Sequence, residues 1–221
     1  MSQGRIFAIG DIHGYLNKLR ALMSKISIDP DKDKLVFLGD YIDRGPQSRE
    51  VVDYILEIKW LYPDTVCLLG NHEVMFREYL ANPRDPWTFL INGGVETIHS
   101  YELTGDDPVT GLPPEHLEFF SSLKPYYETE EYIFVHAGLR VGVPLGEQAL
   151  DDLVWIRSEF IDSHHDFGKL VVFGHTPFAR PLVHPNKIGI DTGAGYGGRL
   201  TGLVLPDLTF HATDGALPYG L

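Results

Sequence analysis

The chain has 221 residues, of which 43% are hydrophobic and 22% charged, and its formal net charge at pH 7 is −13. This composition is typical of a folded protein, and no linker-like stretch interrupts it, so we expect one domain covering residues 1–221. The acidic excess and the absence of a Lys/Arg cluster argue against a nucleic-acid partner. No apolar run is long enough for a signal-peptide core or a membrane-spanning helix, so we expect a cytoplasmic protein with no membrane partner.

Five short apolar runs predict buried strands, because they are rich in Val, Ile, Leu and Phe without alternation. They are "RIFAIG" (5–10), "KLVFLG" (34–39), "TVCLLG" (65–70), "YIFVHAG" (132–138) and "KLVVFGHT" (169–176). Two segments with apolar residues at helical spacing lie between the first three runs. The first extends from Tyr15 to Ile26, and the second, with Pro46 as a first-turn residue, extends to Leu61. This β-α-β-α-β order predicts a parallel sheet with right-handed crossovers.

The second half of the chain changes character. Residues 74–131 predict helices and loops, and strands dominate from Tyr132 onwards. The runs "KIGIDTG" (187–193), "LTGLVLP" (200–206) and "LTFHATD" (208–214) resemble an antiparallel meander. We therefore expect an α/β fold in which two sheets pack face to face with helices outside, an α/β/β/α sandwich with a helical insertion after the third strand.

Polar side chains follow five of these strands, each next to a glycine that allows a sharp turn. They are Asp11 and His13, Asp40 and Asp43, Asn71 and His72, His136, and His175. One Gly-Asp pair after a strand is usually a turn or a helix cap. Together, however, so many carboxylates and imidazoles at one sheet edge would be costly without a countercharge. Nitrogen and oxygen ligands without thiolate suit divalent Mn, Fe, Zn or Co, and their number suits two ions.

The motifs "GDIHG" (10–14), "GDYIDRG" (39–45), "GNHE" (70–73), "HAG" (136–138) and "GHT" (174–176), with "LVWIR" (153–157), resemble the metallophosphoesterase signature of the PPP phosphoprotein phosphatases. The resemblance covers nearly the whole chain. The stretch at 116–138 is similar to small bacterial and bacteriophage lambda-type Ser/Thr phosphatases. The same motifs also resemble symmetrical diadenosine tetraphosphate hydrolases, which typically have longer chains.

The resemblance implies a role for each matching residue. Asp11 and His13 would hold a first metal ion, Asp40 would bridge two ions, and Asn71, His136 and His175 would hold the second. Manganese is the expected metal, while iron, zinc, cobalt and nickel also fit the ligands. Two such ions can bridge a water molecule, lower its pKa and align an in-line displacement. His72, oriented by Asp43, would protonate the leaving oxygen. Arg44 and Arg157 would grip the phosphoryl oxygens, with Asn71 and Tyr196 also lining the substrate cleft.

Three functions remain open on this evidence. The first expectation is hydrolysis of phosphoserine and phosphothreonine in proteins or peptides, since only Arg77, Arg84 and Lys124 are basic between residues 74 and 131. The alternative is a dinucleoside polyphosphate hydrolase, whose bases could stack on the aromatic residues Tyr79, Trp87, Phe89 and Tyr101. A non-catalytic, protein-binding scaffold is the third, disfavoured because all catalytic positions are filled. A thiol-based phosphatase is excluded, because Glu73 stands where an arginine would follow Cys67, and Cys67 is expected to be an inert core thiol.

Overall fold

The computed structural model describes residues 4–104, 107–213 and 215–217. Two mixed sheets form its centre, one in the order β11-β10-β9-β1-β2-β3 and the other in the order β4-β5-β6-β8-β7. The strands are β1 (Ile6–Ile9), β2 (Lys34–Phe37), β3 (Val66–Cys67), β4 (Tyr126–Glu128), β5 (Tyr132–Val135), β6 (Leu170–Phe173), β7 (Leu182–His184), β8 (Lys187–Gly189), β9 (Thr201–Leu205), β10 (Thr209–Ala212) and β11 (Gly215–Leu217). The predicted parallel pairing of β1, β2 and β3 is confirmed.

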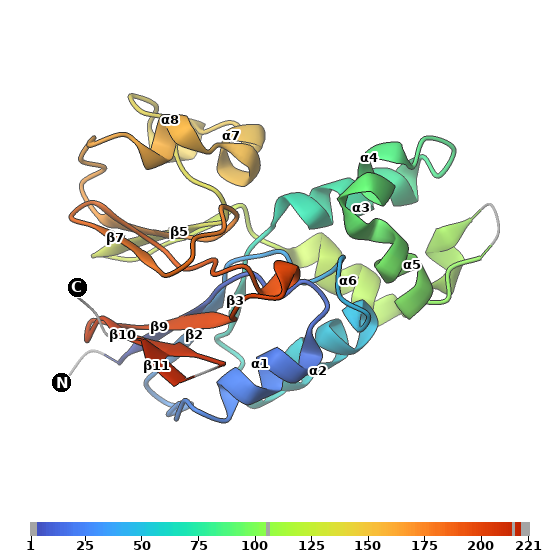
Figure 1. The fold of residues 1–221 in the computed structure, drawn as a ribbon, viewed down its shortest axis with the longest axis horizontal. Helices are drawn as coiled ribbons and strands as arrows, with labels where there is room; N and C mark the ends of the chain where they lie inside the picture. Colours follow the sequence, from blue (N-terminus) through green and yellow to red (C-terminus); the bar gives the residue numbers. More distant parts are fainter. Residues whose placement is uncertain (1–3, 105–106, 214, 218–221) are drawn as a thin grey trace.

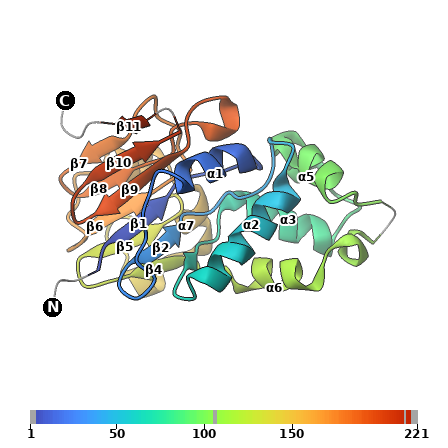
Figure 2. The ribbon, with the colours of Figure 1, turned by 90° about the horizontal axis from the view of Figure 1, so that it is seen from below.

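Helices cover both outer faces of the two sheets. From bottom to top, Figure 1 shows α1 and α2, the first sheet, the second sheet, and then α7 with α8. The helices are α1 (Leu16–Met23), α2 (Ser48–Leu61), α3 (Asn71–Ala81), α4 (Trp87–Phe89), α5 (Val95–Ser100), α6 (Pro114–Ser122), α7 (Leu150–Trp155) and α8 (Ser158–Ile161). The expected four-layer sandwich is therefore confirmed, and α3 to α6 form the predicted insertion beside it (Figure 2). Among the described residues, no helix is both long and apolar enough to cross a bilayer.

The core has two apolar clusters, because successive strand residues point to opposite faces of a sheet. Ala8 on β1 packs with Phe134 and Val172 of the second sheet, which fills the space between the sheets. Its neighbours Phe7 and Ile9 belong to the other cluster, which contains the buried faces of the helices. Both faces of β1 are thus buried, which explains its unbroken apolar sequence.

Three local predictions were wrong in detail. The expected meander is divided between the sheets, since β8 pairs with β6 and β7 whereas β9 and β10 join β1 in the first sheet. Helix α1 ends before Ile26, because after Ser24 the backbone bonds span three residues instead of four. Helix α2 begins two residues after Pro46, because the backbone of Gln47 is not helical and its N–H donates to Gly14 O in the loop after β1.

Candidate active site

The polar residues predicted at the strand ends lie together where the strands of both sheets end. The loops after β1, β2, β5 and β6 and the start of α3 supply them. Buried to at least 95%, they are Asp11, His13, Asp40, Asp43, Asn71, His72, His136 and His175. The strands' parallel direction brings their carboxyl ends to one edge, as ligand sites in such sheets require.

The loops that carry these residues have unusual backbones. Five non-glycine residues have positive φ angles between 51° and 72°: His13, Asp40, Asp43, Arg44 and His175. The left-handed conformation costs a non-glycine residue about 1–2 kcal/mol. Such strain persists only where the surroundings enforce it, and its concentration here marks the region as a functional site.

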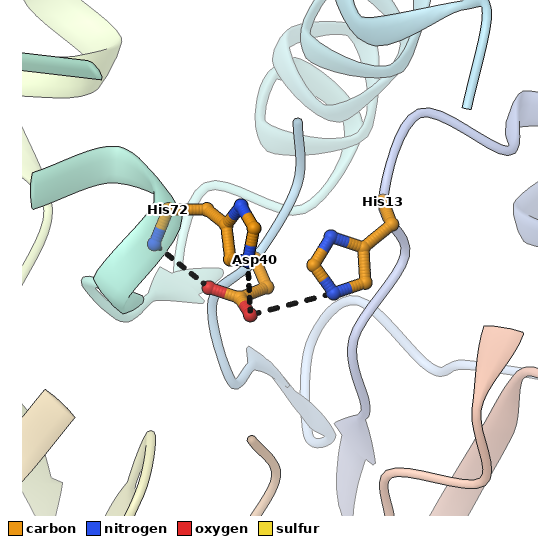
Figure 3. Close-up of side chains that lie close together, drawn as sticks. All are labelled: His13, Asp40 and His72. Carbon is orange, nitrogen blue, oxygen red and sulfur yellow. Dashed lines mark hydrogen bonds and ion pairs between the residues drawn. The ribbon is translucent and has the colours of Figure 1, made fainter. Parts of the chain in front are cut away.

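Asp40 lies between His13 and His72 (Figure 3) and also close to His136. Its Oδ2 lies 3.4 Å from His13 Nε2 and 3.9 Å from His72 Nε2, and its Oδ1 lies 3.3 Å from His136 Nε2. Burial alone would raise the pKa of Asp40, but the surrounding imidazoles, His136 and His72 first, lower it below its ordinary value. Asp40 is therefore a carboxylate with an imidazole on each side.

Two groups of side chains that could hold a metal ion share Asp40. One contains His13, Asp40 and His72, the other Asp40, His136 and His175, and in each the ligand atoms lie within 4.8 Å of one another. Asn71 Oδ1 extends the second group, at 3.0 Å from His136 Nε2 and 2.9 Å from His175 Nδ1. A carboxylate shared by two groups is the arrangement that a pair of ions needs.

Asp11 lies beside both groups without being part of either. Its Oδ2 accepts a hydrogen bond from His175 N at 2.9 Å, while its Oδ1 is buried without a partner. His175 Nε2 is likewise buried and has no partner. Orphaned polar atoms are costly in a protein interior. An oxygen and a nitrogen left open among carboxylates and imidazoles fit a divalent cation, so the residues present suit the expected metal centre.

The imidazoles are held in the state that binds metals. His13 Nδ1 donates to Ile42 O at 3.0 Å, and His136 Nδ1 donates to Leu38 O at 2.8 Å. In each neutral ring Nε2 therefore carries the free lone pair, on the side of Asp40. Burial lowers the pKa of His13 and His136, and it lowers the pKa of His175 to about 2. A lowered pKa favours the neutral ring, which is the form that ligates a metal ion.

His72 is paired with Asp43, as the resemblance implies. Its Nδ1 lies 2.6 Å from Asp43 Oδ2, and this places Nε2 on the side of Asp40. Burial lowers the pKa of His72, yet Asp40 and Asp43 outweigh burial and raise it above the ordinary value. An imidazole whose pKa is raised and whose Nδ1 is oriented by a carboxylate is suited to act as a proton donor.

Two arginines reach the cluster from different loops. The Arg44 guanidinium contacts His13 Nε2 and lies 2.9 Å from His72 Nε2, and its Cζ is 4.5 Å from the ring centre of Tyr196. Arg157 Nη1 donates to Thr176 Oγ1 at 3.2 Å, beside His175. The two predicted phosphate-binding arginines thus approach the two groups of possible metal ligands from different loops.

Further residues at the site were not predicted from the sequence. Asp191 is buried beside Asp11, and its pKa is raised to about 6, chiefly by burial. It follows "KIGI" and precedes Thr-Gly, so the strand-end pattern could have found it. Glu73 is the third residue of α3, and its side chain accepts hydrogen bonds from the backbone N–H groups of Asp40, Tyr41 and Gly70. It fastens the loop after β2 to the loop after β3.

Several predictions outside the cluster can also be assessed. Cys67 is buried and burial raises the pKa of its thiol to about 12, which confirms an inert core cysteine. Of the aromatic residues considered for base stacking, Phe89 and Tyr101 lie in the core and are 2% exposed, so that prediction was wrong for them. Trp87 is 69% exposed. The ring of Trp155 lies 6.0 Å from that of His175, and Trp155 is 37% exposed.

The sandwich and its clustered ligands define a metal-dependent phosphoesterase. The calcineurin-like phosphoesterase family model matches residues 4–193, and the chain belongs to this family. The family uses divalent metal ions, in agreement with the His/Asp groups.

Known proteins resemble the chain over its whole length. A protein from Anoxybacillus flavithermus named bis(5'-nucleosyl)-tetraphosphatase PrpE [asymmetrical] is 27% identical over 96% of this chain and 94% of its own. A Bacillus cereus protein of the same name is 26% identical with the same coverage. A crystal structure of a candidate diadenosine tetraphosphatase superposes with a TM-score of 0.71 at 24% identity, covering 99% of this chain and 96% of that one. The structure of a Saccharomyces cerevisiae protein serine/threonine phosphatase superposes with a TM-score of 0.66 at 17% sequence identity, covering 92% of this chain and 73% of that one. Both of these solved structures have the same fold as this chain.

Proposed function

We propose that the protein hydrolyses bis(5'-nucleosyl) tetraphosphates asymmetrically, with two divalent ions, manganese first among them. The full-length relatives carry that name, which favours the dinucleotide alternative, in its asymmetrical form, over the phosphoprotein expectation. The structural observation that carries the proposal is a pair of exposed aromatic rings beside the ligand cluster. Tyr196 is 66% exposed next to Arg44, and Trp155 lies next to His175. Stacking of a base on such a ring contributes about 1–3 kcal/mol.

The side chains at the site have separate tasks in this reaction. Those that would hold the ions are Asp11, His13, Asp40, Asn71, His136 and His175. When bound, two divalent ions supply an activated water and neutralise phosphoryl charge. Arg44 and Arg157 orient the phosphoryl oxygens through paired N–H donors. His72 gives its Nε2 proton to the leaving oxygen, while Asp43 holds the Nδ1–H and stabilises the charged ring.

A phosphoserine or phosphothreonine side chain is the second candidate substrate. The observation that favours it is the His72–Asp43 pair at 2.6 Å, because an alkoxide leaving group needs a proton donor more than a nucleotide does. The two arginines and the metal charge are sufficient to hold one phosphoryl group.

The deciding experiment compares kcat/KM for diadenosine tetraphosphate with that for a phosphothreonine peptide at one Mn²⁺ concentration. We expect the dinucleotide to win by at least tenfold, about 1.4 kcal/mol of transition-state preference, and to give ATP and AMP. A tenfold advantage for the peptide would overturn the proposal, and two ADP as products would replace asymmetrical by symmetrical cleavage. Trp155→Ala should lower kcat/KM for the dinucleotide more than for p-nitrophenyl phosphate.

A further inference from the structure

A buried hydroxyl from the helical insertion reaches the carboxylate that orients His72. Thr97 lies on α5, 54 residues along the chain from Asp43, and both residues are 0% exposed. Thr97 Oγ1 is 2.6 Å from Asp43 Oδ1, on the oxygen that does not face His72. Each carboxylate oxygen of Asp43 thus has one short partner, a hydroxyl on one side and the imidazole on the other.

The number of protons available fixes the direction of every bond in this network. A threonine hydroxyl has one proton and two lone pairs. Asp43 Oδ1 is a carboxylate oxygen, so the Thr97 proton goes to it. Thr97 Oγ1 then accepts from Asp43 N at 2.9 Å and from the hydroxyl of Ser48 at 3.0 Å. Ser48 Oγ also accepts from Asp43 N at 3.1 Å, but among the described contacts of Ser48 there is no hydrogen bond to the carboxylate. Thr97 is therefore the hydroxyl that contacts both the main chain and the carboxylate of Asp43.

The same insertion holds the strained turn on which Asp43 stands. Asp43 and Arg44 are consecutive non-glycine residues with φ angles of 72° and 67°. Arg44 N donates to Gly93 O at 3.0 Å, just before α5. A side chain at Gly93 would come within 2.8 Å of Arg44 Cγ, so the two segments are in close contact. The segment from Gly93 to Thr97 therefore supports both residues of the turn.

We propose that Thr97 is a positioning residue that sets the orientation of Asp43, and through it the hydrogen bond that aims His72 at the leaving oxygen. This inference rests on the proton-donor role of His72 in the proposed function. Without the Thr97 hydroxyl, Asp43 Oδ1 loses its partner and the carboxylate can rotate away from the imidazole. Proton donation weakens as a result, while metal binding and phosphoryl binding remain.

The test compares Thr97→Val, which removes the hydroxyl at nearly constant shape, with Thr97→Ser, which retains it. Ser48→Ala is the matched control, because it removes a neighbouring buried hydroxyl that does not contact the carboxylate. Each variant is assayed with an alkyl and an aryl phosphate, whose leaving groups differ in their need for a proton. We expect Thr97→Val to lower kcat on the alkyl ester about 10- to 100-fold, a part of the roughly 10²–10⁴-fold that a positioned proton donor contributes. The kcat on the aryl ester should fall less than tenfold. For Thr97→Ser and Ser48→Ala the ratio of kcat on the alkyl ester to kcat on the aryl ester should equal that of the wild type.

A second measurement does not depend on activity. The imidazole Nδ1–H resonance of His72, assigned by its loss in His72→Asn, is recorded by NMR in Zn²⁺-loaded protein. It should weaken or shift in Thr97→Val and persist in Thr97→Ser. Equal losses on both esters, or a Thr97→Val variant with the wild-type ratio and resonance, would overturn the inference. If His72→Asn itself shows no preference between the esters, the proton-donor role fails instead, which separates the two hypotheses.

Discussion

At the scale of single residues, the chemistry depends on how each ionisable group is paired. Asp40 stays a carboxylate because imidazoles surround it, whereas burial raises the pKa of Glu73 to about 8 although three N–H groups bind it. His72 differs from the other imidazoles of the cluster because Asp43 holds its Nδ1, where His13 and His136 contact backbone carbonyls. A carboxylate partner favours the protonated ring, and a carbonyl partner leaves a neutral ligand.

The first prediction concerns this difference. His72→Asn should lower kcat by about 10²–10⁴-fold on alkyl phosphates, because the leaving alkoxide loses its proton donor. The kcat on aryl phosphates should fall less, because their leaving groups need less protonation, and the metal content should stay near that of the wild type. Steady-state kinetics and elemental analysis measure both. His116→Asn is the control, since this buried histidine bonds Tyr101 and Asp53 instead. Loss of metal, or equal losses on the two esters, would contradict the assignment.

At the scale of elements, a buried lysine connects the second sheet to the helix that follows Arg157. Lys187 on β8 is 0% exposed, and its Nζ donates to Phe160 O, to Ile161 O at 3.2 Å and to Ser163 O at 2.7 Å. These carbonyls belong to the end of α8 and the residues after it, so all three ammonium protons have acceptors. The short helix α8 is held on the sheet by this contact, and Arg157 immediately precedes it.

The second prediction is that Lys187→Met lowers the free energy of unfolding by about 1–3 kcal/mol. The substitution leaves buried carbonyl oxygens without their donor. Urea unfolding measures the change. Lys32→Met is the control, because Lys32 is 67% exposed and its pair with Asp29 belongs to the surface type that contributes little. A loss no larger than that of the control would show that α8 does not depend on the buried lysine.

At the scale of the whole molecule, an acidic protein must bind an anionic substrate. The net charge of −13 repels phosphate, and the cluster itself concentrates Asp11, Asp40 and Asp191. Burial first, and then Asp191 and Asp40, raise the pKa of Asp11 well above its ordinary value. Bound cations would relieve this repulsion and reverse the local field, so that metal binding stabilises the fold as well as the substrate complex.

The third prediction follows from this coupling. Exhaustive chelation should abolish activity and lower Tm, and Mn²⁺ should restore both. At a metal concentration 100 times Kd the stabilisation is about 2.7 kcal/mol, which for a chain of this size corresponds to roughly 5–11 °C. Differential scanning calorimetry measures the shift, with metal-saturated chelator as the control. Full turnover by metal-free protein would exclude the binuclear assignment.

The class of protein, and the clustering of the polar residues at the strand ends, could be predicted from the amino-acid sequence. The strand-to-glycine junctions are local, so a few consecutive letters place Asp11, Asp40 or His175 at the end of a strand. Parallel strands then bring those ends to one edge without further information. The apolar runs were equally informative, because β1 and β2 are buried on both faces.

The contacts between segments far apart in the chain could not be predicted and are seen in the folded structure. In the folded structure β8 and β9 belong to different sheets, although both strands arise from the same kind of apolar run. The fold buries Phe89 and Tyr101 in the insertion and leaves Trp155 and Tyr196 exposed beside the ligands. It also brings Thr97 to Asp43 from 54 residues away. The physical reason is that sheet pairing and burial depend on contacts summed over the whole chain, whereas a turn depends on its own few residues.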